Sequence, residues 1–252
     1  MPGHIGEAVL LVVELSIIFL ASKIASRRKV KGTDLFDLGK IEGWIREASS
    51  MKRCIFFTTG TGSVDAPDTL AGLELLRYVA KACVQQNAQL IVANADMGVQ
   101  QITEDIVKSS YTDSGRPNEY TPDSVRYLSG SVFAYAAGVM GLVRREKPAV
   151  NFFVGDFAAE ALIIAEAGRS VAMHQFGGTS SVVEMPVFLA TCDQTLIGSE
   201  LYAAQSYLTG DVEATSQLFG EDAGKVVAVL LILIGVVLLS FGNSFLAALI
   251  GW

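Results

Sequence analysis

Apolar and polar residues follow two periods along the middle of the chain, and uniformly apolar runs lie near its two ends. Residues 5–24 and 226–250 are each long enough to cross the hydrocarbon core of a bilayer as a helix, at about 1.5 Å per residue. Between them, short apolar runs are each followed by a stretch of helical periodicity. The pattern predicts an α/β domain flanked by an N-terminal and a C-terminal transmembrane helix.

The middle segment predicts a Rossmann-like, mostly parallel sheet with helices on both faces, because strands and helices alternate. The expected strands are residues 54–60, 88–95, 125–129, 149–156, 170–178 and 192–198. The expected helices are residues 66–86, 98–111, 132–146, 158–168, 180–190 and 199–209. The segment has the length of one domain with its own core, and its sequence contains no internal repeat.

The charges beside the first apolar run predict its orientation. A basic cluster lies at the end of the run and just after it: Lys23, Arg27, Arg28, Lys29 and Lys31. No lysine or arginine precedes the run. The positive-inside rule therefore places the α/β domain in the cytoplasm and both termini outside. The apolar face of residues 35–45 either lies on the membrane surface or packs on the domain. The predicted segments are 1–24 (transmembrane helix 1), 25–50 (basic juxtamembrane linker and amphipathic helix), 51–222 (cytoplasmic α/β domain) and 223–252 (transmembrane helix 2).

Two carboxylates lie within the first predicted span. Glu7 and Glu14 are seven residues apart and therefore share a helical face. A carboxylate inside a bilayer is costly, so Glu14 is expected to face protein or to be protonated. Ser240 and Asn243 of the second span reach a similar depth and offer it hydrogen bonds. A proton or ion path lined by Glu7 and Glu14 is the functional alternative.

Small residues recur in the second predicted span. Ala228, Gly235 and Gly242 are spaced by seven and form one stripe. Such stripes let helix backbones approach closely, either within one chain or between neighbouring chains. The stripe therefore favours helix packing and is consistent with a homo-oligomer.

Composition narrows the range of functions. The chain has 252 residues and a formal net charge of −7, which makes nucleic acid an improbable partner. Its three cysteines are widely spaced, as is typical of reduced core residues. With only two histidines, the sequence excludes a histidine-rich metal site. The sequence does not decide whether the protein binds a cofactor.

Polar residues gather where the expected strands end, and ligands of parallel sheets bind beyond the carboxyl ends of the strands. Two stretches, "GTGSVDAPDT" (60–69) and "GGTSS" (177–181), predict a small anionic ligand held by backbone N–H groups and hydroxyls. The alternative is that the glycines make tight turns and that Asp68, Thr69 or Ser180 caps a helix. Mg²⁺ held by Asp96, Asp156 and Glu160 is an alternative without a recognisable metal motif. The candidate ligand-binding residues are Thr59, Gly60, Thr61, Gly62, Ser63, Asp65, Asn94, Asp96, Asp156, Glu160, Gly177, Gly178, Thr179 and Ser180.

Three stretches carry a family resemblance: "DSVRYLSGSVFAYAAGVMGLV" (123–143), "REKPAVNFFVGDFAAEALIIAEAG" (145–168) and "ATCDQTLIGSELYAAQSYL" (190–208). With them the chain resembles a family of uncharacterised prokaryotic membrane proteins, known only as a domain of unknown function. The resemblance implies one α/β domain beside a pair of membrane helices in a prokaryotic cell membrane. It implies no activity and no catalytic residues.

Four functions remain open. The first expectation is a two-pass membrane protein whose α/β domain assembles into a homo-oligomeric scaffold. The second is a membrane-anchored sensor or binding module for a phosphate- or nucleotide-like ligand. A membrane-tethered hydrolase and an oligomeric ion path through Glu14 are the others. The sequence does not decide whether the protein is an enzyme, although it carries no catalytic signature and leans against one.

Overall fold

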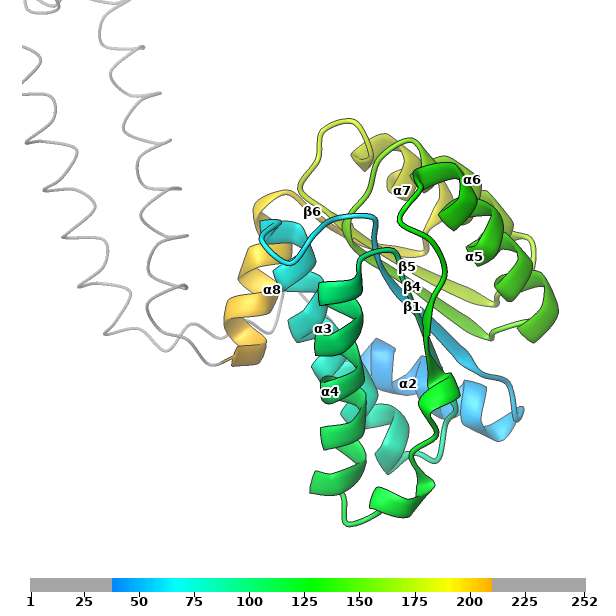
Figure 1. Cartoon of the computed structure of the whole chain (residues 1–252). Helices are drawn as coiled ribbons and strands as arrows, with labels where there is room; N and C mark the ends of the chain where they lie inside the picture. The colour runs from blue at the N-terminus through cyan, green and yellow to red at the C-terminus, as the bar shows by residue number, and fades with distance from the viewer. Residues whose placement is uncertain (1–37, 210–252) are drawn as a thin grey trace, which may run out of the picture. The chain divides into compact units, whose positions relative to one another are not determined.

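A computed structural model describes residues 38–209 of the chain (Figure 1). Both predicted membrane spans and the basic segment after the first lie outside the described residues. So do their candidate residues: Glu7, Glu14, Ala228, Gly235, Ser240, Gly242 and Asn243. Within the described part of the chain, no helix is long and apolar enough to cross a bilayer.

The described domain is built on one six-stranded sheet in which every pairing is parallel. This arrangement confirms the predicted α/β fold with a parallel sheet; the flanking transmembrane helices stay a prediction. The strand order is β3-β2-β1-β4-β5-β6, so the chain first winds toward one edge and then returns to the middle to wind toward the other. The strands are β1 (Ile55–Gly60), β2 (Leu90–Asn94), β3 (Val125–Tyr127), β4 (Val150–Asp156), β5 (His174–Thr179) and β6 (Gln194–Ile197).

Helices cover both faces of the sheet (Figure 1). One layer contains α2 (Leu38–Ser50), α3 (Pro67–Gln85), α4 (Met97–Asp113) and α8 (Ser199–Thr209). The other contains α5 (Val132–Glu146), α6 (Glu160–Arg169) and α7 (Met185–Thr191). Two short 3₁₀ turns, η1 (Pro117–Glu119) and η2 (Pro122–Ser124), connect α4 to β3.

The two central strands are buried on both faces, which explains their uninterrupted apolar sequences. Because side chains alternate along a strand, Phe57 and Phe152 enter the core beneath α3, and their ring centroids are 5.9 Å apart. Phe56 and Phe153 enter the opposite core beneath α5 and α6, with centroids 6.3 Å apart. This double burial fixes the position of the central strands, from whose ends the candidate site is built.

The structure decides between the two alternatives for residues 35–45 and changes the bounds of the fifth strand. Helix α2 packs on the domain, because Ile41 and Ile45 are fully buried in the core; its apolar face is therefore not available to a membrane surface. The fifth strand begins at His174 and not at residue 170, and it extends through Gly177 and Gly178. The prediction placed Gly177 and Gly178 both at the end of this strand and at the start of an anion-binding stretch; the structure places both within β5, next to the central strand β4.

Candidate functional site

The candidate site lies where the winding direction of the sheet reverses, at the carboxyl ends of β1 and β4. The connection after β1 leads into α3 on one face, and the connection after β4 leads into α6 on the other. The two connections therefore leave the sheet toward opposite faces, and their first residues diverge at this point. Open parallel sheets bind their ligands where connections diverge in this way.

The glycine-rich loop after β1 is held against the end of β4. The backbone N–H groups of Thr61 and Gly62 both donate to the carbonyl oxygen of Asp156, at 3.0 and 3.1 Å. Gly60 has a φ of +82°, and a Cβ there would lie 2.1 Å from the same oxygen. These glycines permit a close backbone approach. Since both amides already have an acceptor, they do not provide the predicted anion cradle.

The second predicted anion loop is likewise satisfied within the chain. The N–H of Ser180 donates to the Asp68 carboxylate at 2.6 Å, and the N–H of Ser181 donates to the hydroxyl of Thr179 at 3.1 Å. Gly177 belongs to β5, where a Cβ would lie 2.9 Å from Phe188. The Gly/Ser/Thr sequence here serves strand packing and the exit of the chain from the sheet.

Asp68 connects three elements at this edge. It lies in the first turn of α3, is 6% exposed, and accepts a hydrogen bond from the hydroxyl of Tyr202 on α8 at 2.6 Å. The Ser180 amide and the Thr179 hydroxyl, at 3.3 Å, bring the end of β5 to the same carboxylate. Burial, together with the hydrogen bond to Asp68, raises the pKa of Tyr202, which keeps it a neutral donor.

Asp68 is one of four carboxylates that we call the acidic edge: Asp68, Asp156, Glu160 and Glu184. Burial raises the pKa of Asp156, and the charges of Asp68, Glu184 and Glu160 raise it further. Glu160 is fully buried and accepts from the Thr61 hydroxyl at 2.7 Å and from the Ala158 amide at 3.0 Å. Negative charge therefore dominates this end of the sheet, and it disfavours a phosphate there.

Three buried oxygen atoms around the acidic edge have no hydrogen-bond partner in the described chain: Thr59 Oγ1, Thr69 Oγ1 and Glu184 Oε2. Thr69 Oγ1 and the Asp156 side chain both border Gly62, since a Cβ at that glycine would lie 2.5 Å from each. Buried polar atoms are nearly always hydrogen-bonded in native proteins. Two of these atoms are threonine hydroxyls, which can donate as well as accept, and the third is a carboxylate oxygen, which accepts when ionised.

The remaining predicted site residues are not part of this arrangement. Asp96 follows β2 and caps α4 by accepting from the Val99 amide at 2.9 Å. Asn94 is buried and donates to Thr103 at 3.0 Å. The exposed Ser63 and Asp65 hydrogen-bond to each other. In residues 38–209 no three acidic, histidine or cysteine side chains are grouped to hold a metal ion. The Asp96 carboxylate caps α4 and does not join Asp156 and Glu160 in such a group.

Sequence reasoning missed Asp68, Thr69, Glu184 and Tyr202 as site residues. Asp68 and Thr69 were expected only as possible helix caps. A carboxylate in the first turn after a strand was the available signal, and Asp68 and Glu160 both satisfy it. Glu184 and Tyr202 carry no such signal, because only the folded sheet brings α7 and α8 to this edge.

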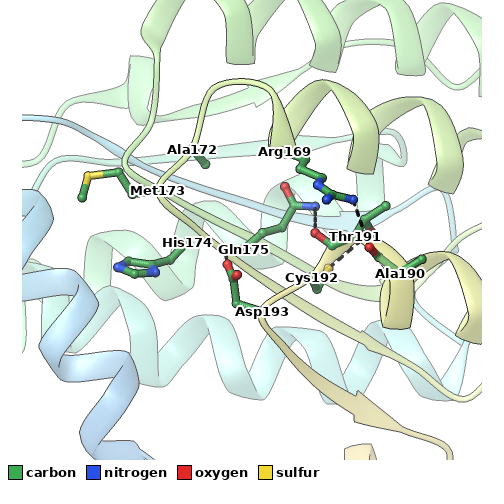
Figure 2. A pocket seen from close by; sticks show the side chains of 9 residues that line it. All are labelled: Arg169, Ala172, Met173, His174, Gln175, Ala190, Thr191, Cys192 and Asp193. Carbon is green, nitrogen blue, oxygen red and sulfur yellow. Dashed lines mark hydrogen bonds between the residues drawn. The ribbon is translucent and has the colours of Figure 1, made fainter.

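A pocket of about 200 Å³ lies at the opposite edge, beside the start of β5 (Figure 2). Figure 2 shows Arg169 and Gln175 directed toward the end of α7, where Arg169 donates to the Ala190 carbonyl at 3.1 Å and Gln175 to the Thr191 carbonyl at 3.2 Å. Cys192 also lines it, and burial raises its pKa to about 11. These polar groups are paired within the chain, and we assign the pocket no ligand.

Comparison with known proteins identifies the family and nothing more specific. No curated protein and no solved structure matches the chain. The model of a domain of unknown function, DUF6754, matches residues 5–250. Because the match spans nearly the whole sequence, the chain belongs to the DUF6754 family.

Proposed function

We propose that the α/β domain is a binding module for a small organic ligand that carries amines or several hydroxyl groups. The observation that carries the proposal is the acidic edge, with unpaired buried oxygens of Thr69 and Glu184 beside it. The carboxylates are not grouped closely enough to hold a metal ion. A larger donor, such as a polyamine or a sugar, spans such a set and pairs its acceptors.

This proposal changes the ligand chemistry expected from the sequence. A phosphate- or nucleotide-like ligand needs free backbone N–H groups or cations, and the N–H groups of Thr61, Gly62 and Ser180 already have acceptors. Any anion would also meet Asp156 and its acidic neighbours. The ligand class that fits this edge is therefore cationic or hydroxylated.

We further propose that the module belongs to a two-pass protein of a prokaryotic cell membrane. The length and apolar character of residues 5–24 and 226–250 support two spans, and the basic residues at positions 23–31 support a cytoplasmic domain with both termini outside. The bilayer is then a partner of the protein. A ligand bound in the domain would be sensed next to the membrane.

The test uses the full-length chain in mild detergent, with spermidine as the amine probe and sorbitol as the hydroxyl probe. We expect at least one probe to raise the unfolding temperature, because binding to the folded state alone stabilises it. The Asp156→Asn variant should lose that gain, while Asp105→Asn, which removes an exposed carboxylate of α4, should keep it. No gain with either probe, or an equal gain in both variants, would refute the binding module.

Asp156→Asn should also make the unliganded protein more stable at pH 7, by about 0.5–2 kcal/mol. Since the pKa of Asp156 is raised in the folded state, its contribution to stability is fully present below the ordinary aspartate pKa and is lost as the pH rises through the raised value. The advantage of the variant should therefore shrink on acidification. Thermal unfolding between pH 4 and pH 8 measures it; a constant advantage would argue against ionisation as its cause.

The homo-oligomeric scaffold is the second candidate, and one observation favours it. Apolar side chains stand exposed on α6, on α7 and on the connection before α7: Leu162 (58%), Val182 (78%), Val183 (80%) and Leu189 (61%). Exposed apolar surface of this kind marks interaction sites. A second copy of the chain is the partner that the scaffold supplies.

Replacing both Val182 and Val183 with serine should weaken self-association at least about tenfold, because burying each valine contributes about 1.5 kcal/mol or more. Native mass spectrometry of the full-length chain in mild detergent reads the subunit number. Leu70→Ser removes an exposed apolar side chain from α3, on the other face of the sheet, and should leave the oligomer intact. A monomeric wild-type chain would exclude the scaffold.

The other two alternatives gain no support from the site. A hydrolase needs a base beside its nucleophile, but His174 begins β5 at the opposite edge of the sheet and pairs with Glu47 at 3.1 Å. It is therefore remote from Ser63 and Ser180. The ion path through Glu14 lies outside the described residues.

A further inference from the structure

A second candidate site, of opposite charge, lies at the amino ends of the central strands. A cavity of about 610 Å³ opens there. Its lining consists of the residues just before β1, β2, β4 and β5: Lys52, Arg53, Cys54, Gln89, Glu146, Lys147, Ser170 and Val171. On a chain of net charge −7, this cavity carries three cations and one carboxylate. We call it the basal cavity.

The carboxylate of the basal cavity is neutralised by its neighbours. Glu146 lies 2.9 Å from an Arg145 nitrogen and 3.1 Å from an Arg126 nitrogen. Hydrogen bonds from Arg145 and Arg126 hold its pKa below the usual range. Burial raises the pKa of Cys54 to about 11, so the thiol is neutral. The positive charge of the cavity is therefore not cancelled by its own lining.

Arg53 is anchored on one side and open on the other. Its Nε donates to the carbonyl of Lys147 at 2.9 Å, and its Nη2 donates to the carbonyls of Pro148 and Val171 at 2.9 and 3.0 Å. Its Nη1 has no acceptor in the described chain. A guanidinium fixed in this way loses little entropy when it binds an oxyanion, which its planar donor groups fit well.

The backbone beneath the two lysines is unusual. Lys52 and Lys147 have φ values of +54° and +50°, and each follows the last turn of a helix, α2 or α5. Glycine or asparagine ordinarily occupies this left-handed position, and α3 follows that rule with Asn87. Lysine pays a conformational penalty there. Backbone strain of this kind clusters at functional sites, and both strained lysines line the same cavity.

We infer that the basal cavity binds a phosphate group, held by the guanidinium of Arg53 and the ammonium groups of Lys52 and Lys147. The cavity is large enough for a phosphate with an attached organic group. A phosphorylated metabolite and the headgroup of an anionic lipid share this chemistry. The site is independent of the acidic edge, which lies at the other ends of the strands.

The experiment is calorimetric titration of the full-length chain in neutral detergent, with inorganic phosphate in one arm and dioctanoyl phosphatidic acid in the other. Lys52→Gly/Lys147→Gly should bind at least about tenfold more weakly and yet unfold at a temperature higher by about 2–4 °C per substitution, because glycine relieves the backbone strain. Lys52→Arg/Lys147→Arg should retain binding. Lys81→Gln/Lys108→Gln, on exposed positions of α3 and α4, controls for lost charge.

Binding in the phosphate arm identifies a free phosphate compound, and binding in the lipid arm alone identifies a headgroup. Equal affinity of the wild type and the glycine variant in both arms would overturn the assignment, as would a wild type that binds neither probe at millimolar concentration. If the glycine variant fails to fold, Lys52→Gln/Lys147→Gln takes its place, and retained affinity in that variant would equally overturn the assignment.

Discussion

Replacing Asp68 with alanine should lower the free energy of unfolding by about 2–4 kcal/mol. The carboxylate accepts hydrogen bonds from the Tyr202 hydroxyl and the Ser180 amide, both at 2.6 Å, and from the Thr179 hydroxyl at 3.3 Å. Its loss leaves these donors without their acceptor where Thr179 is fully buried. Because the donors come from β5 and α8, α3 would lose its polar connection to both elements.

Thermal unfolding of the full-length chain should register this loss as a fall of about 5–12 °C. Asp68→Asn is expected to lie between wild type and alanine, since its amide oxygen accepts from one donor while its NH₂ group opposes another. Asp65→Ala removes an exposed carboxylate from the loop just before α3 and should change stability by less than about 0.5 kcal/mol. Equal effects at positions 65 and 68 would contradict the connecting role of Asp68.

The central strands could be predicted from the sequence, but the hydrogen-bond partners of Asp68 could not. The central strands were predictable because β1 and β4 are buried on both faces and so have continuous apolar sequences. The carboxyl-edge position of Asp156 and Glu160 followed from those strands. The partners of Asp68 did not, because Tyr202 is 134 positions away, and only the strand order brings α8 beside α3.

The glycines illustrate a second limit. A Gly-Gly pair followed by hydroxyls has the sequence of an anion-binding loop, yet Gly177 and Gly178 lie inside β5 and make room for Phe188 and Val154. Likewise the apolar face of α2 fits a membrane surface as well as a protein core, and the burial of Ile41 and Ile45 decides for the core. In each case local sequence allows two environments, and tertiary packing selects one.

The sequence also did not show that acidic and basic side chains gather at opposite ends of the strands. The four carboxylates of the acidic edge follow strands or begin helices, whereas Lys52, Arg53 and Lys147 follow helices and precede strands. Parallel strands place all such positions on opposite edges, so one edge is acidic and the other basic. An anionic ligand is therefore expected at the edge opposite to the one that the glycine-rich loops suggested.

The second large effect is expected at Gly72, where α3 passes over the end of β4. A Cβ at this position would lie 2.2 Å from the carbonyl oxygen of Val154 and 3.3 Å from Cγ2 of Thr59. The nearest atom is backbone in a buried strand, so a side-chain rotation cannot relieve the overlap. Gly72→Ala should therefore push α3 from the sheet and cost about 3 kcal/mol or more, seen as a fall of about 6–12 °C in the unfolding temperature.

Gly141 supplies the matched control, because it also lies in a helix, α5, but a Cβ there meets nothing within 4 Å. Alanine at position 141 should stabilise the protein by about 0.5–1 kcal/mol, since it restricts the unfolded chain and favours the helix. Replacing glycine with alanine should therefore lower the free energy of unfolding at Gly72 and raise it at Gly141. If Gly72→Ala were neutral or stabilising, the close approach of α3 to β4 would be wrong. The arrangement of Asp68 and Thr69, one turn earlier on α3, would then be wrong with it.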